Sequence, residues 1–400
     1  MRWTLLLFLL LGQITLQAQA PKVVGYLPSY RFSLNDQLAY EKLTHLNLAF
    51  LNPDTLGNWS IAGADINPII QKARQVNPNI QIYISIAGGA VNAEWAAAYN
   101  KFMQPDKLGG FVQSLIAYAN QYQLDGLDID LEWSNVNSLY SPFVLALRDS
   151  VDIHGLGLTA ALPGTYRYPE ISDPALQAYD WINLMAYDLT GPWAPNNPGP
   201  HSPYSFATQS ITYWQGQGLS QEQMVLGVPF YGYDFSNGGS AFRYAGMVEQ
   251  DTAYAWIDQV GQRYYNGILT IRSKTALALQ SCDGIMIWEI GQDAFGQYQD
   301  YSLLSVIDES INISSSIEGN WQEQLSIGPN PFQSSFKLFT DSGLALEWSL
   351  WDMQGRIVKR GQLLNGQNQM EVPTSELAAG LYHLRLQYQD QVLQQKMVKY

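Results

Sequence analysis

The chain has 400 residues, a net charge of −14, 13% aromatic residues and one cysteine. This length suits one large domain followed by a smaller one. The acidic charge argues against nucleic acid and anionic membranes as partners, because both require a basic surface, and a single cysteine excludes an internal disulfide. The four histidines are scattered without the spacing of metal ligands, so we expect neither a metal nor another cofactor.

The first 20 residues have the pattern of a secretory signal peptide. An arginine near the start is followed by the apolar run from Leu5 to Leu11 and by the small-residue cleavage site Ala18-Gln19-Ala20. This run is far shorter than the ~20 residues that span a bilayer, and we find no later segment that could span one as a helix. We therefore expect an exported protein without a membrane span.

From Val23 to about Ile307, short apolar runs alternate with longer helical or loop segments. The runs begin at Val23, Thr44, Ile80, Leu124, Leu156, Trp181, Met224 and Gly284. Between them, segments such as Leu108 to Tyr122 have apolar residues at helical spacing. Eight such alternations predict an α/β fold, a closed (β/α)8 TIM barrel over residues 21–311. A doubly wound open sheet is the alternative, but no GxGxxG turn follows the first run.

The fourth run carries the strongest functional signal, because residues 125–133 read DGLDIDLEW. Asp128, Asp130 and Glu132 alternate with aliphatic residues, so on a strand the acids share one face, roughly 7 Å apart. Unpaired acids on an inward face are too costly for an ordinary core strand. A solvent-facing sheet would explain the alternation, but not why the row ends in a glutamate followed by Trp133. Because barrel active sites lie at the carboxyl ends of the strands, the row predicts catalysis.

This stretch matches the DxxDxDxE signature of the family 18 glycoside hydrolases, the chitinase family. Further motifs of that family occur before and after this stretch, in the order that the family has them. Residues 85–89 (SIAGG) resemble its SxGG motif, and residues 185–188 (MAYD) resemble its MxYD motif. Residues 227–232 and 284–289 resemble its seventh and eighth strands. The resemblance covers about residues 22–307 and implies the same barrel that the periodicity predicts.

The resemblance implies an endo-acting chitinase that cleaves β-1,4-linked N-acetylglucosamine polymers with net retention, using the substrate's own acetamido group as nucleophile. Glu132 would be the acid and base, Asp130 would orient the acetamido group, and Asp128 would share a proton with Asp130. Tyr187 would donate a hydrogen bond to the acetamido carbonyl. Trp288 would form the floor beneath the sugar, because an indole suits stacking on a sugar face.

The remaining candidates line the substrate groove or support it. Besides Trp288, the substrate-binding candidates are Asp188, Met185, Tyr26, Ser85 and Trp133. Asp188 could bind the sugar or cap the following loop, and we expect Ser85 to support Asp128 more than to touch substrate. Between Tyr231 and Trp288 we expect no room for the α+β subdomain that walls the groove in some relatives. An open cleft of this kind would suit endo-action.

Two other functions would use the same motifs. An endo-β-N-acetylglucosaminidase acting on the chitobiose core of N-glycans shares the acidic row, so the signature does not separate it from a chitinase. Subsite loops, especially residues 193–204, would decide between them. A non-catalytic chitin-binding lectin on the same barrel is disfavoured, because such proteins commonly lack the acid at the position of Glu132.

Beyond the barrel, the polar and aperiodic residues 312–324 predict a linker. Residues 325–400 change to the strand-and-turn pattern of a small immunoglobulin-like β-sandwich. GPNPFQ at residues 328–333, WDMQGRIV, LAAGLYHLRL and the terminal KMVKY resemble the C-terminal sorting domain of the type IX secretion system of Bacteroidota. This implies export to the cell surface or medium, with the secretion machinery as partner. The rival interpretation is a carbohydrate-binding module using Trp348 and Trp351, but the tail's motifs carry the match.

Overall fold

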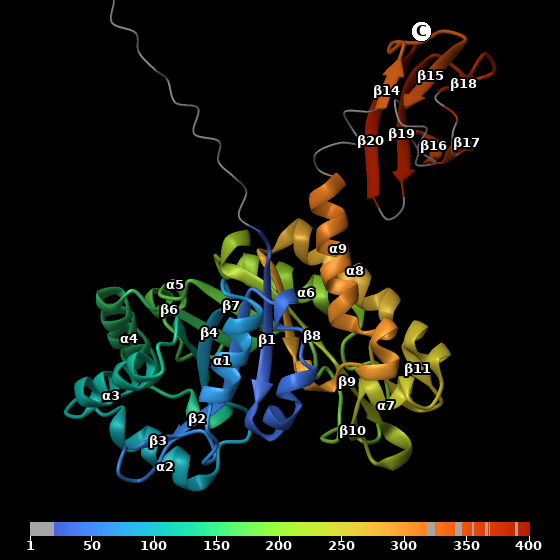
Figure 1. Ribbon diagram of the computed structural model, residues 1–400. Coiled ribbons are helices and arrows are strands. Elements are labelled where there is room, and N and C mark those ends of the chain that lie inside the picture. Colours follow the sequence, from blue (N-terminus) through green and yellow to red (C-terminus); the bar gives the residue numbers. More distant parts are fainter. Residues whose placement is uncertain are drawn as a thin grey trace, which may run out of the picture. The chain divides into compact units, whose positions relative to one another are not determined.

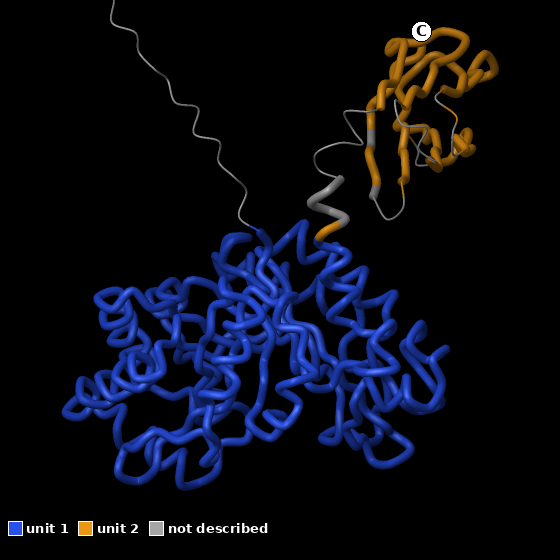
Figure 2. The backbone as a smooth tube through the Cα atoms, viewed as in Figure 1, with its two compact units in different colours: residues 1–311 blue, residues 312–400 orange. Residues whose placement is uncertain are grey.

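The computed structural model describes residues 20–317, 325–340, 346–353, 356–364, 367, 369–388 and 391–400. The chain divides into two compact units, residues 1–311 and 312–400 (Figure 2). Apart from Ala20, the predicted signal peptide lies outside the described residues. So do residues 318–324 of the predicted linker.

Eight parallel strands form the centre of the first unit and close into a barrel (Figure 1). In order around the barrel they are β1 (Lys22–Pro28), β2 (His45–Pro53), β4 (Gln81–Ala87), β5 (Gly126–Asp130), β6 (Gly157–Pro163), β7 (Trp181–Met185), β8 (Met224–Pro229) and β13 (Gly284–Trp288). The barrel closes because β1 pairs with β13 on one side and with β2 on the other. These are the eight predicted runs, and the predicted barrel is confirmed. A two-residue strand, β3 (Trp59–Ser60), pairs antiparallel with the end of β2.

Helices surround the barrel and cover the outer face of its strands (Figure 1). They are α1 (Asn67–Val76), α2 (Ala93–Phe102), α3 (Leu108–Gln121), α4 (Tyr140–His154), α5 (Asp173–Gln177), α6 (Tyr204–Gly216), α8 (Ile268–Ser281) and α9 (Leu303–Ile317). Helix α3 confirms the helical spacing of its segment, since Phe111, Leu115 and Ala119 on one side of it are buried. Helix α9 continues to Ile317, so the predicted linker begins as helix.

A small α+β insert lies between β8 and α8, where we expected none. It contains β9 (Tyr231–Asp234), β10 (Ser240–Arg243), α7 (Tyr244–Val248), β11 (Gln259–Val260) and β12 (Arg263–Tyr264), and its strands form one antiparallel sheet. The expectation that this stretch has no room for an α+β subdomain is wrong because strands of two to four residues are too short to show a periodicity. Gly238 and Gly239, with φ of 64° and 80°, allow the tight turn between β9 and β10.

The second unit consists of two antiparallel sheets. One contains β14 (Leu325–Gly328), β15 (Ser335–Thr340) and β18 (Gln369–Pro373). The other, in the order β17-β16-β19-β20, contains β17 (Ile357–Leu363), β16 (Leu346–Asp352), β19 (Gly380–Tyr388) and β20 (Gln391–Lys399). Phe336 and Leu338 of the first sheet share one buried cluster with Leu350 and Leu384 of the second. Alternate residues of each strand therefore face a common core, as the predicted β-sandwich requires.

Candidate active site

Asp128 lies on the inward face of β5 and is fully buried. Each of its carboxylate oxygens accepts two hydrogen bonds. The donors are Tyr26 OH at 2.6 Å, Ser85 Oγ at 2.7 Å, Thr159 Oγ1 at 2.6 Å and Asn183 Nδ2 at 3.2 Å. They come from β1, β4, β6 and β7, whose inward side chains meet in the middle of the barrel. Burial raises the pKa of Asp128, and the four donors oppose this shift because they stabilise the carboxylate.

Asp130 lies on the same face of β5, nearer to the carboxyl end of the strand. It is 4% exposed, and its Oδ1 has no hydrogen-bond partner among the described residues. Burial and the charges of Glu132 and Asp128 hold the pKa of Asp130 well above its ordinary range. A buried polar atom without a partner costs about 1–3 kcal/mol, so this carboxyl group is ready to pair with a donor on a bound ligand.

Glu132 follows β5 and is partly buried at the rim of the barrel. Its carboxylate lies against Gly89, where an added Cβ atom would come within 2.6 Å of Glu132 Oε1. Gly88, with φ of +81°, leaves similar room for the Phe50 ring. The glycines of the 85–89 motif thus make space for the acid and for an aromatic neighbour. Burial and the charge of Asp188 raise the pKa of Glu132 to about 7.

Two aromatic side chains flank this row of acids. Trp288 ends β13 and stacks on Phe50, with ring centroids 5.5 Å apart, while the Tyr26 ring meets it edge-on at 5.6 Å. Tyr187 follows β7 and is 9% exposed, with its hydroxyl 4.0 Å from Met286 Sδ. Burial raises the pKa of Tyr187 well above its usual value, so the phenol keeps its proton and remains a donor.

Asp188 is held by side chains from the insert and from the loop after β7. Its Oδ1 accepts hydrogen bonds from Tyr231 OH at 2.5 Å and Tyr233 OH at 3.0 Å, and lies 3.3 Å from His201 Nδ1. Asp188 has a φ of 63°, in the left-handed region that aspartate tolerates better than most residues. The insert therefore positions the charge that raises the pKa of Glu132.

A buried lysine anchors the same loop to α8. Lys274 Nζ donates to Ser202 O at 2.6 Å, Ser202 Oγ at 2.7 Å and Asn266 Oδ1 at 2.7 Å. Burial lowers the pKa of Lys274 to about 7. Ser202 follows His201 directly, so Lys274 fixes the segment that contacts Asp188. Sequence reasoning did not single out this lysine, because an acidic chain with ordinary surface lysines offers no sign that one is buried.

The structure brings most of the predicted site residues together. Tyr26 and Ser85 are buried and donate to Asp128, so both support the acid, and for Tyr26 this replaces the place in the groove that we expected. Met185 ends β7 and packs in the same aromatic cluster as Trp288. Trp133 is 67% exposed beside the acid row, where a ligand could reach it.

Thr159, Asn183, Phe50 and His201 also belong to the site, although no motif pointed to the first three. Thr159 is the register partner of Asp128 on β6, and Asn183 lies one strand further on. Their inward positions in predicted strands were a usable signal, but only the register shows that they meet Asp128. His201 lies in the segment that sequence analysis named as a subsite loop, and the structure shows it buried against Asp188 and Tyr231.

Neither a metal centre nor a membrane helix is found in the part of the chain that the structure describes. No group of three or more His, Cys, Asp or Glu side chains there could hold a metal ion. None of the described helices is long and apolar enough to cross a membrane.

Comparison with known proteins agrees with this geometry. The model of the glycosyl hydrolases family 18 matches residues 22–293, and that of the secretion system C-terminal sorting domain matches residues 326–400. The structure resembles the GH18 chitinase ChiB from the chitin utilization locus of Flavobacterium johnsoniae, with 41% identity, a TM-score of 0.72 and coverage of 74% of this chain and 96% of that one. A chitinase from Bacteroides thetaiotaomicron gives 28% identity, a TM-score of 0.65 and coverage of 73% and 97%.

Among curated relatives, the class V chitinase of Arabidopsis thaliana is 28% identical over 255 residues. The match covers 56% of this chain and spans 65% of the length of that relative. The barrel that holds the acid row thus agrees with both the family model and the solved structures. The chain belongs to the glycosyl hydrolases of family 18 and carries a C-terminal sorting domain of the type IX secretion system.

Proposed function

We propose that the protein is a secreted chitinase that hydrolyses β-1,4-N-acetylglucosamine linkages by substrate-assisted catalysis with retention. The observation that carries this proposal is that Asp128, Asp130 and Glu132 lie in three different environments. Asp128 is saturated with donors, Asp130 has an oxygen without a partner, and Glu132 has a pKa of about 7 at the rim. The three carboxyl groups thus have three different environments, which suits an anchor, a ligand-orienting group and an acid.

In the first step, Glu132 donates its proton to the glycosidic oxygen as the bond from C1 to that oxygen breaks. The carbonyl oxygen of the 2-acetamido group attacks C1 from the other face and closes an oxazolinium ring. Asp130 accepts a hydrogen bond from the acetamido N–H, and its negative form stabilises the positive charge of the ring. Tyr187 donates a hydrogen bond to the acetamido oxygen and aligns it for attack.

In the second step, the Glu132 carboxylate takes a proton from water, which attacks C1 and opens the oxazolinium ring. Two displacements at C1 give net retention. Asp128 acts through Asp130. The four donors around Asp128 favour its ionised form, and that charge helps to hold a proton on Asp130 until the substrate arrives, when the proton passes to Asp128 and leaves Asp130 negative. A proton shared between the two aspartates remains a prediction.

The mode of attack on the polymer also remains a prediction. We argued for endo-action from an open cleft, and the insert beside Asp188 removes that argument. Endo-action predicts a fast fall in the viscosity of soluble chitin and a mixture of oligomer lengths among early products. Release of disaccharide alone, without that fall in viscosity, would contradict it.

The C-terminal domain supports export. Its match to the sorting domain family, together with the signal-peptide pattern of residues 1–20, supports transport to the cell surface or medium of a Bacteroidota-type bacterium. This location suits an enzyme whose polymeric substrate cannot enter the cell.

The test of function compares two substrates. The purified protein is incubated with N-acetylglucosamine tetramer and, separately, with a high-mannose glycoprotein, and NMR records the anomer of the first reducing ends. We expect tetramer cleavage with β-anomer formed first, and no cleavage by the Glu132→Gln control. Glycan release from the glycoprotein without tetramer cleavage would identify an N-glycan endoglycosidase. Binding of chitin with no hydrolysis above the control would identify a lectin.

A further inference from the structure

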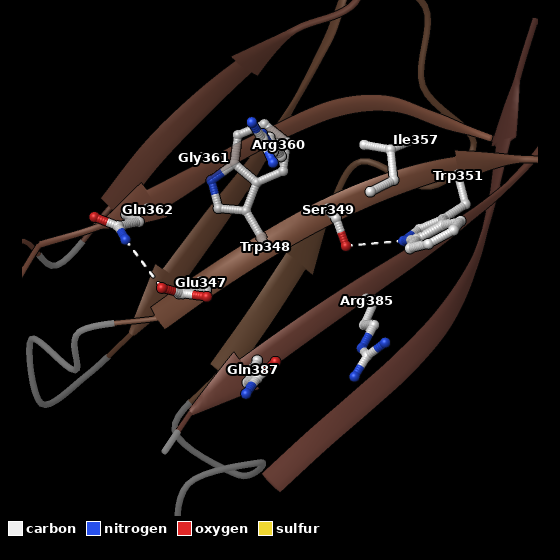
Figure 3. Close-up of a pocket in the computed structure, with 10 residues that line it drawn as sticks. All are labelled: Glu347, Trp348, Ser349, Trp351, Ile357, Arg360, Gly361, Gln362, Arg385 and Gln387. Carbon is white, nitrogen blue, oxygen red and sulfur yellow. Dashed lines mark hydrogen bonds between the residues drawn. The ribbon is translucent and has the colours of Figure 1, made fainter. Parts of the chain in front are cut away.

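The four-stranded sheet of the C-terminal unit has a hollow that chitin hydrolysis does not use. Its volume is about 660 Å³, and β16, β17 and β19 line it (Figure 3). Arg360, Ser349 and Arg385 form its middle row, because Ser349 is the register partner of both arginines. Glu347 lies on one side of this row and Trp351 on the other. We call these five residues the outer-face hollow, since they alternate with the buried residues of their strands.

The side chains of the two arginines of the hollow have no partner among the described residues of the unit. Their backbones pair in the sheet, but neither guanidinium group makes a hydrogen bond or an ion pair with any residue that the structure describes. Their backbones lie two strand spacings apart, about 10 Å. The Ser349 side chain between them is short, so it does not fill the space between the two guanidinium groups. Two guanidinium groups in this arrangement attract carboxylates, which arginine binds through paired hydrogen bonds.

The other two side chains of the hollow are held in place. Trp351 Nε1 donates to Ser349 Oγ at 2.8 Å, and Gln362 Nε2 donates to Glu347 Oε1 at 3.0 Å (Figure 3). The indole and the one acid therefore do not need to be ordered when a partner binds. Tryptophan and arginine in a hollow are the residue types that dominate the energy of protein–protein interfaces.

We propose that the outer-face hollow is the surface through which the secretion machinery recognises this sorting domain. Its partner is a protein that presents a carboxylate-bearing loop to Arg360 and Arg385. An acidic polysaccharide would satisfy the same charges but fits less well. Trp348 is 8% exposed and faces the core with its Nε1 near Met370, so Trp351 alone is left to stack on sugars. This inference rests on the proposed export.

The experiment follows export of the full-length protein in a bacterium with a type IX secretion system. Immunoblots measure the fraction in the medium and on the surface against the fraction retained in the periplasm. We expect Arg385→Glu to lower the exported fraction at least tenfold and Arg360→Glu to lower it less, because Arg360 is more exposed. The matched control is Lys337→Glu, the same charge change at an exposed position of β15, which should leave export unchanged.

A fold control accompanies these variants. Purified Arg385→Glu should unfold at the wild-type temperature and retain wild-type chitinase activity. If it unfolds earlier, Arg385→Gln, which removes the charge without adding repulsion, should still reduce export. A chain lacking residues 326–400 shows separately whether this domain sorts at all. Normal export of both Arg385 variants, with loss of export on that deletion, overturns the proposed surface and leaves the proposed export intact. Binding of an acidic polysaccharide that depends on Arg385, with unchanged export, overturns it as well.

Discussion

The two units of this protein differ in where their charged residues lie. Residues 21–311 contain 27 acidic and 13 basic residues, and several of them, including Asp128, Asp130, Lys274 and Asp293, are buried. Residues 312–400 contain eight acidic and seven basic residues, and Lys399 is the one buried charged residue among those that the structure describes there. Burying a charge is costly. The barrel bears this cost at the acid row, where chemistry needs shifted pKa values, and at Lys274, which fixes a loop of the site. The sorting domain keeps its charges outside, where a partner can reach them.

The largest expected effect comes from neutralising Asp130, whose Oδ1 has no hydrogen-bond partner among the described residues. Asp130→Asn should lower kcat about 10²- to 10³-fold with little change in KM, because it removes charge that stabilises the oxazolinium but leaves binding surfaces intact. Steady-state kinetics on N-acetylglucosamine tetramer measures both constants. The control is Asp149→Asn on the exposed side of α4, which should leave kcat and KM unchanged. Equal losses in the two variants would show that burial of the acid does not matter.

The pH profile tests whether the raised pKa of Glu132 is functional. Glu132 must be protonated to donate, so kcat/KM should fall above a pH of about 7, by about tenfold per pH unit. Asp188→Asn should shift this fall in kcat/KM to lower pH. The substitution removes the negative charge that, together with burial, raises the pKa of Glu132. A profile that stays flat to pH 9, or a limb that Asp188→Asn leaves in place, would contradict the assignment.

The buried lysine should make stability depend on pH. Burial lowers the pKa of Lys274 from 10.5 to about 7 in the folded protein. Between these values the unfolded chain binds a proton that the folded protein lacks, so wild-type stability should rise with pH by up to ~1.4 kcal/mol per unit. Lys274→Met should lose this rise, and urea unfolding at pH 7, 8 and 9 measures it. The Lys72→Met variant, at a partly exposed position on α1, should keep the wild-type slope, and a Lys274→Met variant with that slope would refute the prediction.

The smallest expected effect concerns the second unit. A chain without residues 326–400 should cleave N-acetylglucosamine tetramer with kcat/KM within about twofold of the intact protein, because each unit has its own core. The same kinetic assay measures this. A loss of tenfold or more would mean that the sorting domain takes part in catalysis, and the contrast between the units would fail.

Sequence analysis predicted the eight barrel strands because parallel strands are buried on both faces and appear as continuous apolar runs. Elements without such a run were missed. The insert from Tyr231 to Tyr264 has strands of two to four residues, too short for any pattern. Tyr26 was placed among substrate contacts because a residue's position along a strand does not say how deep its side chain lies in the barrel.

The sequence by itself determined that Asp128 and Asp130 share one strand face and that Glu132 follows them at its carboxyl end, since alternation along a strand is a local property of the chain. It also determined, through ordered motifs, the family and the sorting domain. Only the tertiary structure decided how the acids differ. Thr159 and Asn183 are far from Asp128 in sequence and reach it through the strand register, whereas no described donor reaches Oδ1 of Asp130. Such pKa differences arise from burial and from contacts between distant residues, which the linear pattern does not record.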